Sequence, residues 1–440
     1  MAWTVFAFGG IGPIAALVPA AGCIALAGLC RPSVLRHPRS REVDAFLLLA
    51  LGASLLQLAP LPRGVLSVVS PASLGVEAAF SLAEPSTRVR PLTIDARDST
   101  HAALLLGFVF LLFFTAREIF ERGGTRAVTR LIAITGLVLA AIALAQNATG
   151  GGLMYWRFAP DREGPDPFGP FTNRNHFATW AIMAVPLCLG YLAAHVAAHP
   201  HRATNWRTRV VAVLDGRAWM LVAASVLLIV ATAASLSRSG IIGLTAGVAG
   251  IVLVIRRTQD PPGARATRAI LYVAVLAGAV TLGILSQAGP GALAGRFGAS
   301  GAALADRLAI WHDTLTVLKD FWATGTGVGT FQTAMAVYQR SRPEVIFNQA
   351  HNHYLQIAAE GGLLVGVPLG LAGAAFVRAA WTSIRADRSP LRYLRAGAAS
   401  GLAGVALQSV WETGLTMPSN AALAAVLAAM IVHGPRGTAD

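Results

Sequence analysis

Long apolar runs separated by short clusters of charged residues constrain the fold of this chain more than any other feature of its sequence. Of the 440 residues, 55% are hydrophobic and 13% are charged. A stretch of roughly 20 apolar residues crosses a bilayer as a helix, because a helix satisfies its own backbone hydrogen bonds in lipid. The pattern therefore predicts an all-α, polytopic integral membrane bundle.

Eleven segments qualify as membrane spans, and we expect about 11 to 12 transmembrane helices in the folded protein. A twelfth would arise if the first apolar run, which contains Pro13 and Pro19, is split into two helices. The predicted spans are 4–29, 44–60, 102–116, 131–148, 177–194, 218–234, 241–255, 269–287, 361–377, 396–410 and 417–432.

The formal net charge of +14 would suit nucleic-acid binding if the basic residues formed one patch, but they are distributed among loops. Most of the 35 Lys and Arg residues lie in every second connection and in the C-terminal tail. Loops that face the cytoplasm carry such an excess of basic residues. We therefore expect no nucleic-acid partner, a cytoplasmic position for these loops and an N-terminus outside. The basic loops are 31–43, 117–130, 195–217, 256–268 and 378–395.

The whole chain, 1–440, is predicted to form a single integral membrane domain, and two of its outer loops are long. Loop 61–100 contains an amphipathic segment that is expected to lie in the membrane interface or to pack against the protein. Loop 288–360, between the eighth and ninth spans, has a glycine-rich start, a helical pattern of apolar residues and a glycine break at 325–329. A loop of this length with its own secondary structure is usually functional.

Unusual polar motifs stand at the outer ends of the predicted spans, where the topology brings them together. They are the segments 171–177, 235–240, 307–311 and 351–362. Such a gathering of ionisable residues on one side of the membrane predicts a single extracytoplasmic site.

Arg238 lies in the short connection between the sixth and seventh spans, close to the membrane surface. An ionisable group there is costly, so it predicts a functional role with an anion as partner. Ser237 and Ser239 supply hydroxyl groups that suit a phosphate. The alternative is an arginine that extends toward lipid phosphates without a function.

Two further arginines are predicted to bind anions. Arg307 stands four residues before Trp311, so the indole ring is expected to pack against the guanidinium if the segment is helical. An ordinary ion pair of Arg307 with Asp306 or Asp313 remains the alternative. Arg174 lies between two asparagines at the mouth of a span, where anion binding and helix capping are both open.

His351 is the residue that we predict to act as general base. A neutral imidazole at the outer mouth of a span is able to take a proton from a hydroxyl nucleophile. On one straight helix it would share a face with Tyr354, whereas Gln356 and Glu360 would form a separate polar stripe with His353. A buried structural histidine is the alternative.

These motifs resemble the O-antigen ligase and O-antigen polymerase superfamily of bacterial envelope glycosyltransferases, to which O-antigen ligases are the closer match. The matching stretches are Asn173-Arg-Asn-His-Phe-Ala178, Ser237-Arg-Ser-Gly240, Arg307-Leu-Ala-Ile-Trp311, Gly325-Thr-Gly-Val-Gly-Thr-Phe331, His351-Asn-His-Tyr-Leu-Gln356 and Glu360-Gly-Gly362. Each stretch is short, and the resemblance depends on their order and placement. The first 150 residues match in hydropathy alone.

The resemblance implies an inverting, metal-independent transfer of a glycan from undecaprenyl diphosphate to an acceptor hydroxyl, without a cofactor, at the periplasmic face of the bacterial inner membrane. It also implies that His351 is the base and that Arg238 and Arg307 hold the diphosphate; we expect Arg174 to assist them. Supporting roles are predicted for neighbouring side chains: Asn175, Ser239, Trp311, Asn352, Tyr354, Gln356 and Glu360.

The acceptor remains open among related reactions. Ligation to a lipid A-core sugar is our leading hypothesis, followed by polymerisation on a growing glycan and by O-glycosylation of a protein. A transporter of lipid-linked sugars belongs to a different class and would place polar groups on interrupted helices near the middle of the bilayer. The clustering of the motifs at one face favours an enzyme.

Overall fold

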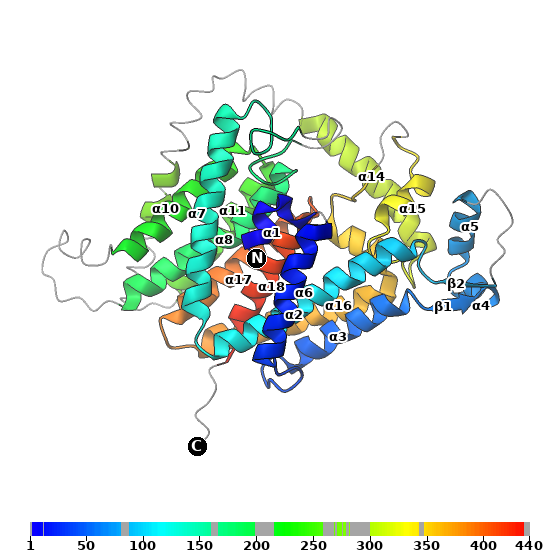
Figure 1. The fold of residues 1–440 in the computed structure, drawn as a ribbon, viewed down its shortest axis with the longest axis horizontal. Coiled ribbons are helices and arrows are strands. Elements are labelled where there is room, and N and C mark those ends of the chain that lie inside the picture. The colour runs from blue at the N-terminus through cyan, green and yellow to red at the C-terminus, as the bar shows by residue number, and fades with distance from the viewer. Residues whose placement is uncertain are drawn as a thin grey trace, which may run out of the picture.

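The computed structural model describes residues 2–11, 13–80, 88–159, 166–198, 215–257, 300–342 and 347–434, together with 268, 271–274, 276–278 and 281. The described chain is mostly helical, as predicted, with one small two-stranded sheet. Figure 1 shows the helices arranged as a bundle, with a separate group of short elements on one side.

Six described helices are long and apolar enough to cross a membrane. They coincide with six of the predicted spans and extend most of them by several residues. They are α6 (Ala96–Glu121), α7 (Thr125–Thr149), α8 (Arg174–Ala198), α10 (Gly216–Ala234), α11 (Arg238–Arg256) and α16 (His353–Ala386).

Three other predicted spans also correspond to helices, and the total of eleven or twelve stays a prediction. Helices α3 (Arg41–Leu56), α17 (Leu391–Gln408) and α18 (Pro418–Val432) lie at three of them. The predicted span 269–287 falls largely outside the described residues.

The first predicted span is not one helix, and the run is divided, which is the alternative considered above for this proline-containing segment. It divides into α1 (Ala2–Phe6), η1 (Phe8–Gly10) and α2 (Pro13–Cys30). The chain turns at Gly9 and Gly10, whose φ angles are 73° and 93°, and a Cβ atom on Gly9 would lie 2.8 Å from the sulfur of Met417. The left-handed backbone and this close approach break the helix, where hydropathy alone predicted continuity.

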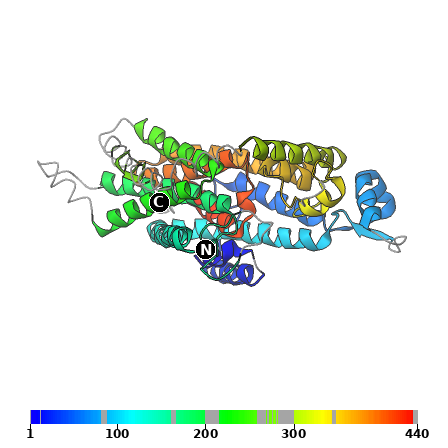
Figure 2. The same cartoon turned by 90° about the horizontal axis from the view of Figure 1, so that it is seen from above.

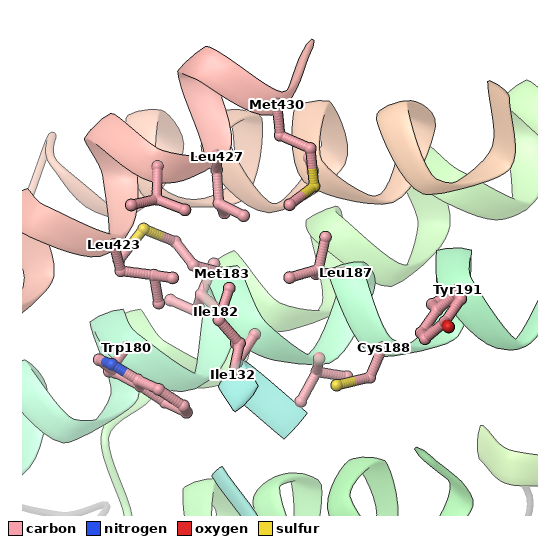
Figure 3. Packing of buried hydrophobic residues seen from close by; sticks show 14 of the residues in the cluster. Ile132, Trp180, Ile182, Met183, Leu187, Cys188, Tyr191, Leu423, Leu427 and Met430 are labelled. Atoms are coloured by element: carbon pink, nitrogen blue, oxygen red, sulfur yellow. The ribbon is translucent and has the colours of Figure 1, made fainter. Parts of the chain in front are cut away.

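Helix α8 forms the centre of the bundle and is buried along nearly all of its length. It packs against α7, α10, α11, α17 and α18. Small residues bring α8 and α17 together, because a Cβ atom on Gly397 would lie only 2.2 Å from the carbonyl oxygen of Pro186. Such close contact of small residues is typical of helix packing in membranes. Figure 3 shows Met183 and Leu187 of α8 near Leu423 and Met430 of α18.

Both long outer loops contribute to a second, smaller apolar core. Strand β1 (Pro60–Pro62) pairs antiparallel with β2 (Val89–Pro91), and α4 (Arg63–Val69) and α5 (Pro71–Phe80) lie between them in the chain. From loop 288–360 come α14 (Ser300–Asp320) and α15 (Phe331–Tyr338). Val76 of α5 packs with Phe321 and Phe331. These elements lie at one end of the elongated molecule in Figures 1 and 2.

Within segment 61–100, the predicted amphipathic stretch contains two short helices, α4 and α5, and its position in the membrane interface stays a prediction. Val68 and Phe80 keep 80% and 56% of their surface exposed, which leaves an apolar surface on this segment. The glycine-rich start of loop 288–360 lies outside the described residues up to residue 299.

Candidate functional site

The buried carboxylate of Glu412 brings together three of the four predicted polar motifs. Glu412 follows α17, and its side chain is 2% exposed. Its Oε1 accepts hydrogen bonds from Arg307 Nη2 and from Asn175 Nδ2, each at 2.7 Å. Its Oε2 lies 3.7 Å from His351 Nδ1. Segments far apart in the sequence thus meet at one acidic group.

The fourth motif joins this cluster through Asn175. The hydroxyl of Ser237 donates to Asn175 Oδ1 at 2.6 Å, so the amide of Asn175 connects Ser237 with Glu412. Ser237 also caps α11, since its Oγ accepts a hydrogen bond from the backbone N–H of Gly240 at 3.2 Å. Asn175 is itself fixed near the start of α8, where its N–H donates to Asn173 Oδ1 at 2.8 Å.

Arg238 is the first residue of α11 and directly follows Ser237, which places it at the same end of the bundle as Glu412. Its side chain is exposed. Ser239, beside it, is buried, and its hydroxyl has no hydrogen-bond partner within the described part of the chain. The start of α11 therefore presents both a cation and an unsatisfied hydroxyl close to the cluster.

Arg307 pairs with Glu412 and with neither Asp306 nor Asp313, the two acidic residues near it in the sequence. Asp306 pairs instead with Arg342, and Asp313 accepts hydrogen bonds from the backbone of Arg340 and Ser341. Burial tends to raise the pKa of Asp313, but the hydrogen bonds from Ser341 and Arg340 outweigh it and lower that pKa. Arg307 remains directed at Glu412.

Trp311 fixes the segment before His351. Its indole N–H donates to the carbonyl of Ala350 at 3.0 Å. This contact acts on the chain that carries the histidine, a role that helical spacing alone did not indicate.

Arg174 is directed toward a different acid. Its Nη1 lies 2.8 Å from Asp166 Oδ2, and its backbone N–H donates to the carbonyl of the same residue. The pairing holds the preceding loop against the start of α8. The structure therefore does not bring Arg174 into contact with Glu412.

His351 lies just before helix α16, not on it, so the expectation that it shares a helical face with Tyr354 was wrong. The helix begins at His353, and the side chain of Asn352 caps it by accepting from Leu355 N at 3.0 Å. His351 has a φ of 49°, in the left-handed region. Tyr354 donates its hydroxyl to Ala406 O on α17 at 2.7 Å.

The turn at His351 aims the imidazole at Glu412. Its Nδ1 is buried and has no hydrogen-bond partner within the described residues. A separation of 3.7 Å from Glu412 Oε2 is too long for a hydrogen bond, yet a small shift of either side chain would form one.

Gln356 and Glu360 form a second polar group next to the cluster. Gln356 Nε2 donates to Glu360 Oε1 at 3.0 Å, and its Oε1 accepts from the backbone N–H of Ala350 at 3.2 Å. Glu360 also accepts from the N–H groups of Gly329 and Phe331, at 2.9 and 3.2 Å. Glu360 therefore fixes residues 325–331, which we call the glycine loop. Through Gln356 it also supports Ala350, the residue before His351.

Helix α16 is interrupted at Gly362, where the glycine loop docks into it. Gly362 has φ 55° and ψ −157°. Beyond it, the N–H groups of Leu363 and Leu364 donate to the carbonyls of Trp322 and Ala323, at 2.9 and 3.0 Å. Before it, the carbonyl of Glu360 accepts from Gly327 N at 2.9 Å. The backbone groups that the break frees are thus satisfied by the loop, as a membrane-associated chain requires.

Sequence reasoning missed Glu412 and Gln57. The side chain of Gln57 is completely buried and donates to the carbonyls of Thr324 and Glu360, at 2.7 and 3.0 Å, which ties the end of α3 to the glycine loop. For Glu412 the available signal was a lone acidic residue in an outer connection, next to two apolar spans. For Gln57 it was a polar residue at the outer end of an apolar run.

Comparison with known proteins finds one family match. Residues 223–370 match the family model described as O-Antigen ligase. The matched region includes Arg238, Arg307 and His351, whereas Asn175 and Glu412 lie outside it. Among the curated proteins, no match was found.

Proposed function

Since the match over residues 223–370 places this chain in the O-antigen ligase superfamily, we propose that it is a membrane glycosyltransferase acting as an O-antigen ligase. It transfers a glycan from undecaprenyl diphosphate to a hydroxyl of lipid A-core. The observation that carries the proposal is the meeting of Arg307, Asn175 and His351 at the buried carboxylate of Glu412.

The pair His351 and Glu412 supplies the base. With its Nδ1–H directed at Glu412 Oε2, the imidazole has Nε2 available for a proton from the acceptor hydroxyl. The acceptor oxygen then forms a bond to the anomeric carbon of the glycan, and the bond from that carbon to the diphosphate oxygen breaks. The proton stays on His351, and the diphosphate leaves on its polyprenyl chain.

The arginines supply the countercharge that the departing diphosphate needs. The guanidinium of Arg307 carries five N–H donors, of which one N–H group contacts Glu412, so other donors remain for phosphate oxygens. Arg238 adds an exposed cation at the start of α11, the positive end of the helix dipole. Such preorganised positive groups stabilise negative charge as it develops on the leaving group.

The proposed site faces the periplasm. It lies at the end of the bundle where α8, α11 and α16 begin, whereas the arginine-rich connections 117–130 and 378–395 lie at the other end. The bias of basic residues assigns that other end to the cytoplasm of a bacterial inner membrane.

The test uses purified protein in lipid, a defined glycan on undecaprenyl diphosphate and several acceptors, each with and without a metal chelator. We expect the glycan to become linked to lipid A-core, both with and without the chelator. Extension of the lipid-linked glycan instead would make the protein a polymerase. Transfer to none of the acceptors, under conditions that keep the protein folded, would refute the glycosyltransferase assignment.

A further inference from the structure

A cavity of about 660 Å³ lies at the end of the bundle opposite Glu412. It is lined where α6 ends at Phe120 and Glu121, where α7 begins at Thr125, and between the end of α16 and the start of α17. None of its lining residues belongs to the proposed transfer site. The cavity is therefore a separate feature that the proposed reaction does not explain.

The cavity carries an excess of positive charge. Arg39, Arg126 and Arg388 line it, and none of the three makes an ion pair within the described chain. Both acidic residues of the lining have partners within the protein. Asp387 Oδ2 accepts from Arg395 Nε at 3.0 Å, and Glu121 lies 2.7 Å from His37 Nε2.

His433, which also lines the cavity, does not add to this charge. Burial, with a further contribution from the nearby Arg395, lowers the pKa of His433 to about 4. The histidine is therefore neutral near pH 7, and the excess charge belongs to the arginines.

A buried hydroxyl points to a ligand independently of the charge. Ser383 lines the cavity, is 1% exposed, and its Oγ has no hydrogen-bond partner within the described residues. Leaving a buried polar group unsatisfied is costly, so such a group calls for a partner. In addition, α7 begins at the cavity without a side-chain cap, which leaves backbone N–H groups of its first turn for an anion.

We propose that this cavity binds the phosphate group of an anionic ligand through Arg39, Arg126, Arg388 and Ser383. Phe120 and Leu391 add apolar surface beside these polar groups, which suits the headgroup of an anionic phospholipid at the membrane surface. A free phosphate compound offers the same chemistry without the lipid chains. The binding needs no donor or acceptor glycan and stands whether or not the transfer reaction does.

The experiment compares wild-type protein with a double variant, Arg126→Gln with Arg388→Gln. The matched control is Arg256→Gln with Arg257→Gln, which removes two charges where α11 ends, near the same end of the bundle and outside the cavity. Binding is measured by native mass spectrometry with phosphatidylglycerol, with phosphatidylcholine and with inorganic phosphate. Because charge-assisted hydrogen bonds are strong, the cavity variant should bind phosphatidylglycerol at least about tenfold more weakly than wild type, with less than about a twofold loss in the control.

Each outcome decides a part of the proposal. A preference for phosphatidylglycerol over phosphatidylcholine that the cavity variant loses identifies a lipid headgroup, whereas saturable binding of inorganic phosphate that the same variant loses identifies a free phosphate ligand. Equal losses in both double variants, or no loss in either, overturn the proposal.

Ser383→Ala provides a second and independent readout. If the cavity binds no ligand, removal of the unsatisfied hydroxyl should leave the stability of the protein unchanged or raise it. If the cavity binds a phosphate group, as we propose, the Ser383→Ala protein should remain folded but bind that ligand severalfold more weakly than wild type. Unchanged ligand affinity in Ser383→Ala would remove Ser383 from the site. Unchanged affinity in this variant and also in the Arg126→Gln and Arg388→Gln double variant would reject the cavity as a phosphate-binding site.

Discussion

Burying a lone carboxylate such as that of Glu412 is expensive unless other groups compensate its charge. Both direct hydrogen bonds, from Arg307 and from Asn175, go to Oε1, while Oε2 faces His351 at 3.7 Å. Oε1 thus holds the side chain of Glu412 in place. Oε2 is positioned to orient the imidazole of His351, as expected of a carboxylate that supports a general base.

Replacing Glu412 by Gln tests this role with little change in shape. The amide keeps an oxygen for Asn175 and Arg307 but removes the negative charge that would stabilise a protonated His351. We expect kcat to fall about 100-fold, with a much smaller change in KM for the donor, because the charge matters when the proton moves. Steady-state transfer rates measure both. A variant with wild-type kcat would show that Glu412 is only a structural anchor.

His351→Ala should abolish transfer because it removes the proton acceptor while leaving expression and membrane insertion normal. The control is His312→Ala, which removes a histidine of α14 whose side chain is 83% exposed. That variant should keep wild-type activity. Transfer activity in membranes with matched protein amounts provides the measurement, and activity in His351→Ala would remove this residue from the mechanism.

Arg238→Ala should also abolish transfer, since the diphosphate would lose a cation at the start of α11. The matched control, Arg256→Ala, lies in the last turn of the same helix. The loss in Arg238→Ala should appear both in transfer and in binding of the lipid-linked donor. If donor binding and transfer survive in this variant, Arg238 is a lipid-facing residue without a catalytic role.

The sequence indicated several of the side chains in the site but not the residue that joins them. Arg307 stood out by its spacing to Trp311, and His351 stood out as an imidazole at the outer mouth of a predicted span. Glu412 owes its importance to the close packing of α17 on α8, where Thr179 Oγ1 donates to Gln408 Oε1 at 2.8 Å. A contact between residues separated by more than two hundred positions leaves no periodic signal in a single sequence.

Among the elements, α16 shows most clearly what hydropathy detects and what it omits. The apolar run predicted a span at 361–377, and the helix that contains it extends from His353 to Ala386. The interruption at Gly362 depends on hydrogen bonds to Trp322 and Ala323, in another segment of the chain. The Glu360-Gly-Gly362 motif therefore encodes a docking site for the glycine loop, which composition and periodicity did not reveal.

Gly362→Ala should disrupt this docking. The backbone at Gly362 adopts a conformation that is almost restricted to glycine, and a Cβ atom would lie 2.4 Å from Gly325 N. We expect a loss of about 1–3 kcal/mol in stability, with reduced transfer activity because the loop supports the chain before His351. Thermal unfolding in detergent and transfer assays measure these effects.

Gly366→Ala is the control, because it lies four residues further along the same helix and a Cβ atom there would meet nothing within 4 Å. This variant should be neutral or slightly stabilising, since alanine favours helix more than glycine does. Equal thermal stability of the two variants would mean that the break in α16 is not a rigid feature of the fold.

In the molecule as a whole, the sorting of polar groups between its two ends connects the fold with the proposed function. Glu412, His351 and the starts of α8 and α11 lie at one end, and the arginine-rich connections around residues 117–130 and 378–395 lie at the other. The alternation of basic and less basic connections along the sequence predicts such a separation. It does not predict the path of each helix between the ends, because that path depends on packing such as that of Gly397 against Pro186.

Cysteine labelling in intact cells tests whether the two ends face opposite sides of the membrane. In a background where Cys23, Cys30 and Cys188 are replaced by Ala, His312→Cys marks the end with Glu412, and Ser389→Cys marks the end with the arginine-lined cavity. A maleimide that reaches the periplasm but cannot cross the inner membrane should label His312→Cys at once. It should label Ser389→Cys only after the inner membrane is permeabilised, because the basic connections are expected in the cytoplasm.

The reverse pattern would place the Glu412 cluster on the cytoplasmic side and would refute the periplasmic transfer reaction even if the cluster itself is correct. Labelling of both positions without permeabilisation would contradict the two-ended arrangement. Retained transfer activity in each single-cysteine variant is the control that the labelled protein is folded. The experiment therefore separates an error in orientation from an error in the chemistry, which the single-residue variants cannot do.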